Sequence, residues 1–227
     1  MTVLFLKCVS EDVTGRTVTE EDYLKSIDEL TLYYGYATLS DISQILGTRR
    51  QSVYDEMKIL LSKGLVNRLD KGEYALTDVG HTEANKFLRK HRIAEILLSE
   101  VLGLPWSQVD QEAMGIEHGI TEEIASRVCE KYGCQICPHG NPVPDTKGHV
   151  REVNDLAYDE LRGLTGVKVS RVIFESREIL QYLESHRILP GTALPVRNGI
   201  PFLREEEQAG EIPTQVHRAL RYLRDTG

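Results

Sequence analysis

Apolar residues recur at the three- and four-residue spacing of helices from Thr19 through much of the first half of the chain. Thr19 precedes three acidic residues, an arrangement typical of a capped helix N-terminus, so a first helix is predicted to begin there. A second helix is predicted after Ser40, its expected N-cap, and a third from Arg50 to Lys63, ending at Gly64. Residues 1–16 show no assignable pattern and are treated as an unassigned leader.

Two short apolar segments, residues 65–69 and 74–77, flank the polar turn at residues 70–72 and are predicted to form a β-hairpin. Helix, glycine-containing turn, helix and hairpin is the order of a winged helix-turn-helix. The alternative is a helical hairpin used for protein contacts, which leaves the trailing strands unexplained. We therefore assign residues 1–77 to a winged helix-turn-helix DNA-binding domain.

The second of the paired helices would enter the major groove, where arginine can pair with guanine and glutamine with adenine. Lysine and arginine are frequent from Arg49 to Arg92, whereas the C-terminal third of the chain is not basic. A face that binds nucleic acid is therefore expected in the N-terminal half. The residues predicted to contact DNA are Arg49, Arg50, Gln51, Ser52, Tyr54 and Asp55.

A long helix is predicted from about Asp78 to Glu100, and a second helical pattern follows a break at residues 103–105. His91 and Glu95 stand four residues apart, which places them on one face of the long helix. The second segment carries Asp110, Met114, Glu117 and His118 at positions i, i+4, i+7 and i+8. A thioether beside carboxylates and imidazoles favours Fe(II), Co(II) or Ni(II) over Ca(II) or Mg(II). The alternative is that the methionine and histidine are core residues and the glutamates a solvated face.

The composition is that of an ordinary globular protein: 227 residues, 41% hydrophobic and 27% charged. The net charge of −8 argues against indiscriminate binding to nucleic acid. We expect neither a signal peptide nor a membrane anchor, and four cysteines are too few for a disulfide scaffold, so a cytoplasmic location is expected. Cys134 and Cys137 form a C-x-x-C, but no second such pair completes a zinc site. Their loop is interpreted as structural.

The pattern changes from about Val167 to short strands and turns around one helix, residues 177–186. This pattern favours a small β-barrel of the SH3-like kind. The predicted divisions are a helical domain at 78–147, a linker at 148–166, the barrel at 167–205 and a tail at 206–227. The tail is expected to be acidic and then helical, with Val216, Leu220 and Leu223 on its apolar face.

Four blocks occur in one order along the chain: RKHRIAEILL at 89–98, EAMGIEH at 112–118, CPHGNPVP at 137–144 and IFESREILQYLESHRILPG at 173–191. On these blocks the chain resembles the iron- or manganese-dependent transcriptional regulators of the diphtheria toxin repressor type, from about Thr19 to Leu203. The resemblance implies a mainly α protein with small β parts. Its expected domains are a winged helix-turn-helix, a helical metal-binding and dimerisation domain, and an SH3-like or FeoA-like barrel.

The resemblance also implies three sets of site residues. The primary metal site would consist of Asp22, Met114, Glu117 and His118. The ancillary metal site would consist of His91, Glu95, Asp110, Glu175 and Glu178. An anion would be held by Arg92 and Asn141.

Asp22 is a hard ligand and Met114 a soft one, so the primary set is a hybrid of the iron-type and manganese-type patterns. We expect Fe2+, with Mn2+, Co2+ and Ni2+ as alternatives. The implied function is a metal-dependent repressor of metal-uptake genes that binds double-stranded operator DNA as a homodimer. It would not be an enzyme, bind a membrane or have a small-molecule substrate.

Two other functions are alternatives. The first is a thiol-based redox regulator that acts through Cys134 and Cys137. The second is a metalloenzyme that uses the histidine and glutamate cluster, although neither an H-E-x-x-H nor a nucleophile motif is present.

Overall fold

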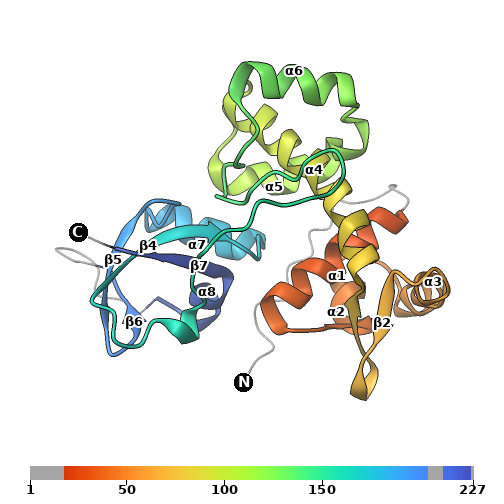
Figure 1. The fold of residues 1–227 in the computed structure, drawn as a ribbon, viewed down its shortest axis with the longest axis horizontal. Coiled ribbons are helices and arrows are strands. Elements are labelled where there is room, and N and C mark those ends of the chain that lie inside the picture. Colours follow the sequence, from red (N-terminus) through yellow and green to blue (C-terminus); the bar gives the residue numbers. More distant parts are fainter. Residues whose placement is uncertain (1–17, 204–211, 226–227) are drawn as a thin grey trace. The chain divides into compact units, whose positions relative to one another are not determined.

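The structure is a computed structural model that describes residues 18–203 and 212–225 (Figure 1). The expected leader at 1–16 and most of the acidic start of the tail lie outside these residues. The chain divides into two compact units, Met1–Arg89 with Pro144–His149, and Lys90–Val143 with Val150–Gly227. No helix in the described ranges is long and apolar enough to cross a membrane.

In the part of the first unit that the structure describes, three α-helices precede α4: α1 Glu20–Tyr34, α2 Leu39–Ile45 and α3 Arg50–Ser62. Thr19 caps α1 as predicted, and Asp22 completes a capping box by accepting the Thr19 N–H over 2.8 Å. α2 begins earlier than predicted, because Thr38 rather than Ser40 accepts the N–H of Asp41 (3.2 Å). Apolar side chains from all three helices form the core and are at most 1% exposed: Ile27, Leu30, Ile42, Val53, Met57 and Leu60.

A three-stranded antiparallel sheet accompanies these helices, in the order β1-β3-β2. Its strands are β1 Ala37–Thr38, β2 Val66–Arg68 and β3 Glu73–Leu76. β2 and β3 form the predicted hairpin, with Val66 opposite Leu76. Its turn is a short 3-10 helix in which Lys71 has a φ of 58°. The sequence does not predict β1, because two residues are too few to show an alternating pattern.

Helix α4, Asp78–Glu100, contributes residues to both units. α5, Val109–Ile116, and α6, Glu122–Tyr132, belong to the second unit. Glu117 and His118 lie in a 3-10 turn after α5, not on one continuous helix as expected. Glycines at 115 and 119 account for this, since glycine disfavours helix. The core between these helices is formed by Ile93, Ala94, Ile96, Leu98, Val109, Ala113, Ala125 and Val128.

The second unit also contains a four-stranded sheet in the order β6-β5-β4-β7. Its strands are β4 Gly166–Val172, β5 Ala193–Arg197, β6 Ile200–Pro201 and β7 Leu220–Arg224, and its helices are α7 Arg177–Ser185 and α8 Thr214–Ala219. The expectation of a helix through Leu220 and Leu223 is wrong. These residues lie on β7, which pairs antiparallel with β4 through a bulge between Val169 and Arg171.

Candidate metal centre

A small hairpin follows α6 and brings polar side chains into the interior of the second unit. We call residues 135–143 the ligand hairpin. The Val143 N–H donates to the Gln135 carbonyl over 3.0 Å, and the Cys137 N–H donates to the Asn141 carbonyl over 2.9 Å. Its tip requires glycine: Gly140 has a φ of +88°, and a Cβ there would lie 2.4 Å from the Ser170 carbonyl oxygen. The hairpin tip therefore packs directly on β4.

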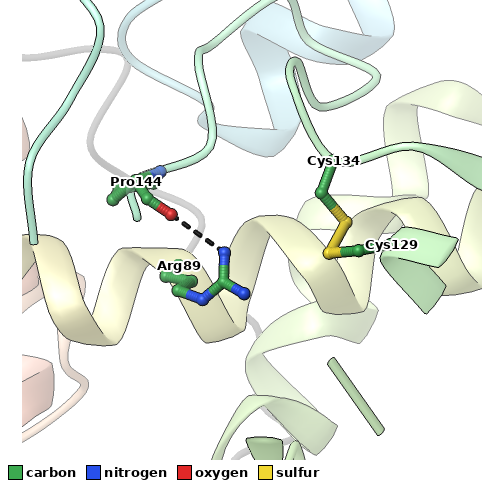
Figure 2. Close-up of a disulfide and its surroundings, with 4 residues drawn as sticks. All are labelled: Arg89, Cys129, Cys134 and Pro144. Carbon is green, nitrogen blue, oxygen red and sulfur yellow. Dashed lines mark hydrogen bonds between the residues drawn. A yellow bond between two sulfur atoms is a disulfide. The ribbon is translucent and has the colours of Figure 1, made fainter. Parts of the chain in front are cut away.

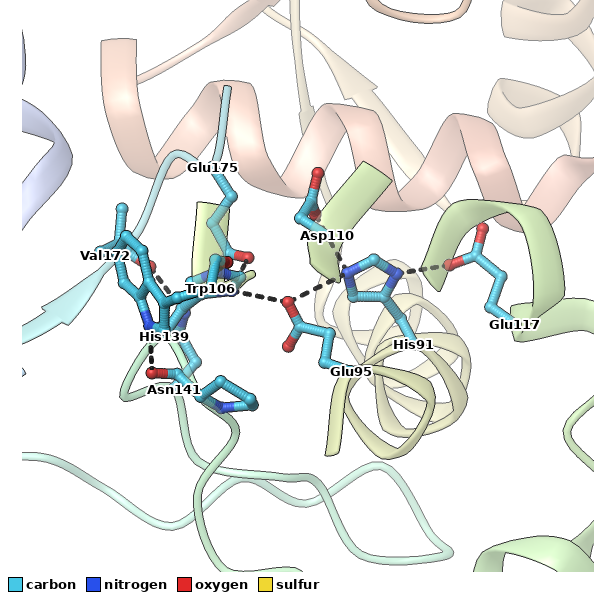
Figure 3. Close-up of polar contacts among 10 residues, drawn as sticks. His91, Glu95, Trp106, Asp110, Glu117, His139, Asn141, Val172 and Glu175 are labelled. Atoms are coloured by element: carbon cyan, nitrogen blue, oxygen red, sulfur yellow. Dashed lines mark hydrogen bonds and ion pairs between the residues drawn. The ribbon is translucent and has the colours of Figure 1, made fainter. Parts of the chain in front are cut away.

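His139, at the tip of the ligand hairpin, faces two carboxylates. Its Nδ1 lies 2.7 Å from Glu95 Oε1 on α4 and 2.7 Å from Glu175 Oε2, just before α7 (Figure 3). Its other ring nitrogen, Nε2, donates to the Trp106 carbonyl oxygen over 3.1 Å. Because a carbonyl can only accept, this contact places a proton on Nε2 and turns Nδ1 toward the carboxylates.

His91 continues the polar chain from the other side of Glu95. Its Nε2 lies 3.1 Å from Asp110 Oδ1 and 3.7 Å from Glu95 Oε1, and its Nδ1 lies 2.6 Å from Glu117 Oε2 (Figure 3). Both His91 and Glu117 are buried. A continuous line of contacts therefore runs from Glu117 through His91 and Glu95 to His139.

Two overlapping groups of donor atoms share Glu95 and Glu175. Within each group the donor atoms lie within 4.8 Å of one another. The groups are Glu95, Cys137, His139 and Glu175, and His91, Glu95, Asp110 and Glu175. Glu95 is 0% exposed, yet its Oε2 has no hydrogen-bond partner among the described residues. A buried carboxylate oxygen without a donor is costly unless a cation meets it. The mixture of carboxylate, imidazole and thiol donors fits a first-row divalent ion.

Burial and charge shift the ionisation of this cluster in opposite directions. Burial alone would raise the pKa of Glu95, but the His139 and His91 imidazoles outweigh it and hold that pKa at about 2. Burial opposes a charge on His139, yet the Glu175 and Glu95 carboxylates raise the pKa of His139 well above its usual range. Burial, followed by the Glu95 charge, raises the pKa of Cys137 to about 12. Without a metal, the cluster therefore holds a protonated imidazole and a neutral thiol beside carboxylates.

Residues 77–145 match the family model described as "Iron dependent repressor, metal binding and dimerisation domain". The crystal structure of T. acidophilum IdeR is 46% identical in sequence, with a TM-score of 0.87, and the match covers 92% of this chain and 100% of that one. The chain belongs to the iron-dependent repressor family. Its fold, with a helix-turn-helix, a helical domain and an SH3-like domain, confirms the predicted fold class.

Two curated proteins and a further solved structure are also similar to this chain. The iron-dependent repressor IdeR of Mycobacterium tuberculosis is 32% identical over 127 residues, which is 56% of this chain and 55% of that protein, so the match spans about half of its length. The diphtheria toxin repressor of Corynebacterium efficiens is 27% identical over 79% of this chain and 83% of its own. The structure of the manganese regulator SloR, at 22% identity over 92% of this chain and 100% of its own with a TM-score of 0.77, shows the fold alone.

Four of the five residues expected in the ancillary metal site lie together: His91, Glu95, Asp110 and Glu175. The fifth, Glu178, is half-buried in the first turn of α7 and belongs to neither donor group within the described ranges. Cys137 and His139 join the group without having been expected as its ligands. The sequence signal that could have indicated them is a cysteine and a histidine two residues apart in a turn-forming segment rich in proline and glycine.

The residues expected in the primary site lie in both units. In the second unit Met114 is half-buried on α5, Glu117 is buried and bonded to His91, and His118 is exposed in the following turn. In the first unit Asp22 is 8% exposed in the first turn of α1, where its carboxylate accepts from Thr19. Their assembly into one site stays a prediction.

The two residues expected to hold an anion both have partners within the protein. Arg92 Nη1 donates to the Pro142 carbonyl over 2.5 Å. Asn141 Nδ2 donates to the Val172 carbonyl over 2.6 Å and to Glu175 Oε1 over 2.7 Å. In this structure the two side chains fix the ligand hairpin and orient Glu175, and anion binding stays a prediction.

The expected DNA-contacting residues form an exposed stretch at the start of α3. Lys58 Nζ lies 4.1 Å from the centre of the Tyr54 ring, and Gln51 Nε2 donates to Asp55 Oδ2 over 3.0 Å. All six side chains, Arg49, Arg50, Gln51, Ser52, Tyr54 and Asp55, are exposed. Their accessibility is what a recognition helix requires.

The cysteines pair differently from the C-x-x-C hypothesis. Cys129 near the end of α6 forms a disulfide with Cys134 (Figure 2). Cys137 is a free, buried thiol. The pairing of Cys134 with Cys137 required by the redox alternative is therefore not the one formed. Cys8 lies outside the described residues.

Proposed function

We propose that this protein is a cytoplasmic, metal-dependent transcriptional repressor in which a divalent cation enables a homodimer to bind double-stranded operator DNA. The observation that carries the proposal is the buried cluster around Glu95, where carboxylates, imidazoles and a thiol converge and Glu95 Oε2 lacks a hydrogen-bond donor. The exposed start of α3 followed by the β2–β3 hairpin supports DNA binding. Its activity is binding, not catalysis.

The cluster would hold the cation through Glu95, Glu175 and His139, with Cys137, His91 and Asp110 as further donors. A bound divalent cation supplies the positive charge that lets these carboxylates remain ionised together away from water. The residues around the cluster position these donors. The Trp106 carbonyl holds His139 in the tautomer that presents Nδ1, while Asn141 fixes Glu175.

We further propose the primary site inferred from the family resemblance: Asp22, Met114, Glu117 and His118. Glu117 supports a link between this site and the cluster, because its Oε2 contacts His91 Nδ1 over 2.6 Å and His91 in turn contacts Asp110. An ion at the primary site that changes the position of Glu117 would therefore also affect His91, which is a donor of the cluster. Repression follows from this proposal only if cation binding changes the affinity for DNA.

We propose Fe2+ as the activating ion. The softer donors, the Met114 thioether and the Cys137 thiol, favour it over Mn2+, while the carboxylates accept either ion. Co2+ and Ni2+ are expected to substitute in vitro, because they prefer similar mixed donor sets.

The decisive experiment measures DNA binding with and without metal. Duplexes selected from a random-sequence library in the presence of Fe2+ would be titrated with protein by anaerobic fluorescence anisotropy, with either Fe2+ or a chelator present. We expect high affinity with Fe2+ and a large loss with the chelator. Equal affinities under the two conditions would overturn the proposal.

A variant of the central carboxylate tests the cluster itself. Glu95→Gln keeps the size of the side chain but removes its charge, so we expect at least about a 10-fold loss of Co2+ affinity by calorimetry. Glu112→Gln, at an exposed position on α5, is the matched control and should bind Co2+ as the wild type does. Far-UV circular dichroism of both variants separates a loss of metal binding from a loss of folding.

A further inference from the structure

The Cys129–Cys134 disulfide lies at the root of the ligand hairpin. Cys129 is in the last turn of α6, and Cys134 immediately precedes the hairpin, with Gly133 between helix and hairpin at a φ of +76° (Figure 2). Cys137 follows three residues after Cys134, and His139 two residues later. The disulfide therefore ties the end of a packed helix to the arm of the hairpin that carries Cys137 and leads to His139.

We propose that Cys129 and Cys134 form a thiol–disulfide switch that sets the metal affinity of the Glu95 cluster. Closed, the disulfide fixes the first arm of the hairpin, which carries Cys137 and leads to His139 at the tip; opened, it leaves that arm free to move and weakens metal binding. The inference rests on the proposed function, in that the cluster must bind a metal.

The contacts of the hairpin explain why the disulfide matters. The tip is held on β4, where the Val172 N–H donates to the His139 carbonyl over 2.9 Å. The second strand is held by Arg92, which donates to the Pro142 carbonyl. The first strand is held less firmly: Gln135 and Ile136 are exposed, Ile136 by 54%, so little apolar burial fixes them. The disulfide covalently links this first part of the hairpin to α6, which is packed in the core.

The two disulfide cysteines are accessible to solvent, whereas the cysteine proposed as a metal ligand is not. Cys129 and Cys134 are both partly exposed at the edge of the helical core, so a reductant can reach them. Cys137 is only 4% exposed, so a reductant in solution does not reach it. Thiol–disulfide exchange at Cys129 and Cys134 can therefore proceed while the Cys137 thiol does not react and stays available as a metal ligand.

The chemical step is thiol–disulfide exchange with a dithiol. One thiolate of the dithiol attacks a sulfur of the Cys129–Cys134 bond and forms a mixed disulfide, which releases the other cysteine as a thiol. The second thiol of the reductant then displaces the remaining cysteine. Two cysteine thiols and one oxidised, cyclic disulfide result, and a disulfide oxidant reverses the reaction.

Cobalt titration of the full-length protein tests the switch. Co2+ would be titrated anaerobically into oxidised protein and into protein reduced with a phosphine that is removed beforehand, with the thiolate-to-cobalt absorption band as the readout. We expect reduced protein to bind about 10-fold more weakly, in line with the effect of losing a group that orients metal ligands. The Cys129→Ser, Cys134→Ser double variant should bind as weakly as reduced protein and show no response to reductant.

Three controls make the result specific. Cys137→Ser should abolish the absorption band in both redox states, which assigns the band to the cluster. Cys8→Ser should leave the redox response unchanged. Far-UV circular dichroism of the double variant verifies that it folds.

The outcomes separate the two proposals. Equal cobalt affinity in the oxidised and reduced proteins, or a double variant that binds as tightly as the oxidised wild type, overturns the switch and leaves the proposed function standing. If neither the oxidised nor the reduced protein binds cobalt through Cys137, metal binding at the cluster itself is overturned.

Discussion

In the proposed metal site, His139 is the residue that would couple metal binding to protonation. Its Nδ1 lies 2.7 Å from carboxylate oxygens of both Glu95 and Glu175, so without metal a proton occupies the position that a cation would take. The raised pKa of His139 is the consequence of these two carboxylates acting against burial. Metal and proton therefore compete for one nitrogen.

Metal binding is expected to release protons. The imidazole of His139 is protonated at neutral pH because its pKa is raised, and the Cys137 thiol, with a pKa of about 12, must also be deprotonated to bind. We expect about two protons to be released per ion near pH 7, so the affinity rises with pH. Calorimetry in buffers of different ionisation enthalpy measures the number. Binding without proton release would mean that neither group is a ligand.

The stability of the metal-free protein should fall at alkaline pH, whereas metal affinity rises with pH. A raised pKa of His139 means that its ion pairs stabilise the fold fully below the usual histidine range and lose this effect as pH rises through the raised pKa. Glu95, with its pKa lowered to about 2, stabilises the fold above the usual carboxyl range and loses this effect as pH falls toward 2. Urea unfolding in the presence of a chelator, repeated across the pH range, measures both trends. His139→Gln should remove the loss of stability at alkaline pH.

At the scale of elements, the segment after the ligand hairpin is fixed within the first unit. We call residues 144–149 the strap. Arg89 Nη1 donates to the Pro144 carbonyl over 3.0 Å (Figure 2). The Asp145 carboxylate accepts the N–H groups of Lys147 and His149 over 2.8 and 2.9 Å. The strap is thus a tight turn with an anchor on α4.

A substitution at Gly148 in the strap tests whether the close approach of this turn to α4 matters for stability. It has a φ of +85°, and a Cβ would lie 2.5 Å from the Thr82 carbonyl oxygen. We expect Gly148→Ala to lower the free energy of unfolding by about 3 kcal/mol, because it combines backbone strain with a clash. Gly163→Ala is the matched control: its φ is +83° but nothing lies within 4 Å, so only about 1 kcal/mol should be lost. Equal losses in urea unfolding would show that the close approach contributes nothing.

The sequence predicts the long elements because their apolar residues repeat locally. α3 and α4 begin and end within a residue of their predicted bounds, and α1 begins directly after its predicted cap, Thr19. The sequence wrongly predicts a helix where β7 lies, because Leu220 and Leu223 continue the helical spacing of Val216 on α8, whereas the pairing of β7 with β4 depends on residues far away in the sequence. The partners of Glu95 were partly missed for the same reason. Helical spacing finds His91, but His139 reaches Glu95 only through the folding of the hairpin.

At the scale of the whole molecule, the proposed activity couples a metal cluster in one unit to a DNA-reading helix in the other. The cluster lies within the second unit, and α3 within the first. Helix α4 is continuous between them, with Arg89 in the first unit and His91 and Glu95 in the second. Any coupling must be expressed as a difference in DNA affinity between metal-bound and metal-free protein.

Such coupling is reciprocal, and this gives a test that needs no variant. If metal tightens DNA binding by some factor, the selected duplex must tighten metal binding by the same factor, in allosteric proteins roughly 5- to 150-fold. Co2+ titrations with and without saturating duplex measure one side of the cycle, and duplex titrations with and without Co2+ measure the other. A scrambled duplex of equal length is the control. A factor of one on both sides would rule out metal control of DNA binding.

Trp106 gives the metal cluster an optical reporter. It is the single tryptophan of the chain, its ring lies edge-on to His139 with centroids 4.6 Å apart, and its indole N–H donates to the Pro138 carbonyl over 2.8 Å. A paramagnetic ion bound at His139 would quench its fluorescence, while a shift of the hairpin would change the emission wavelength through the indole hydrogen bond. The rate of metal entry can thus be followed by stopped-flow fluorescence without any attached dye.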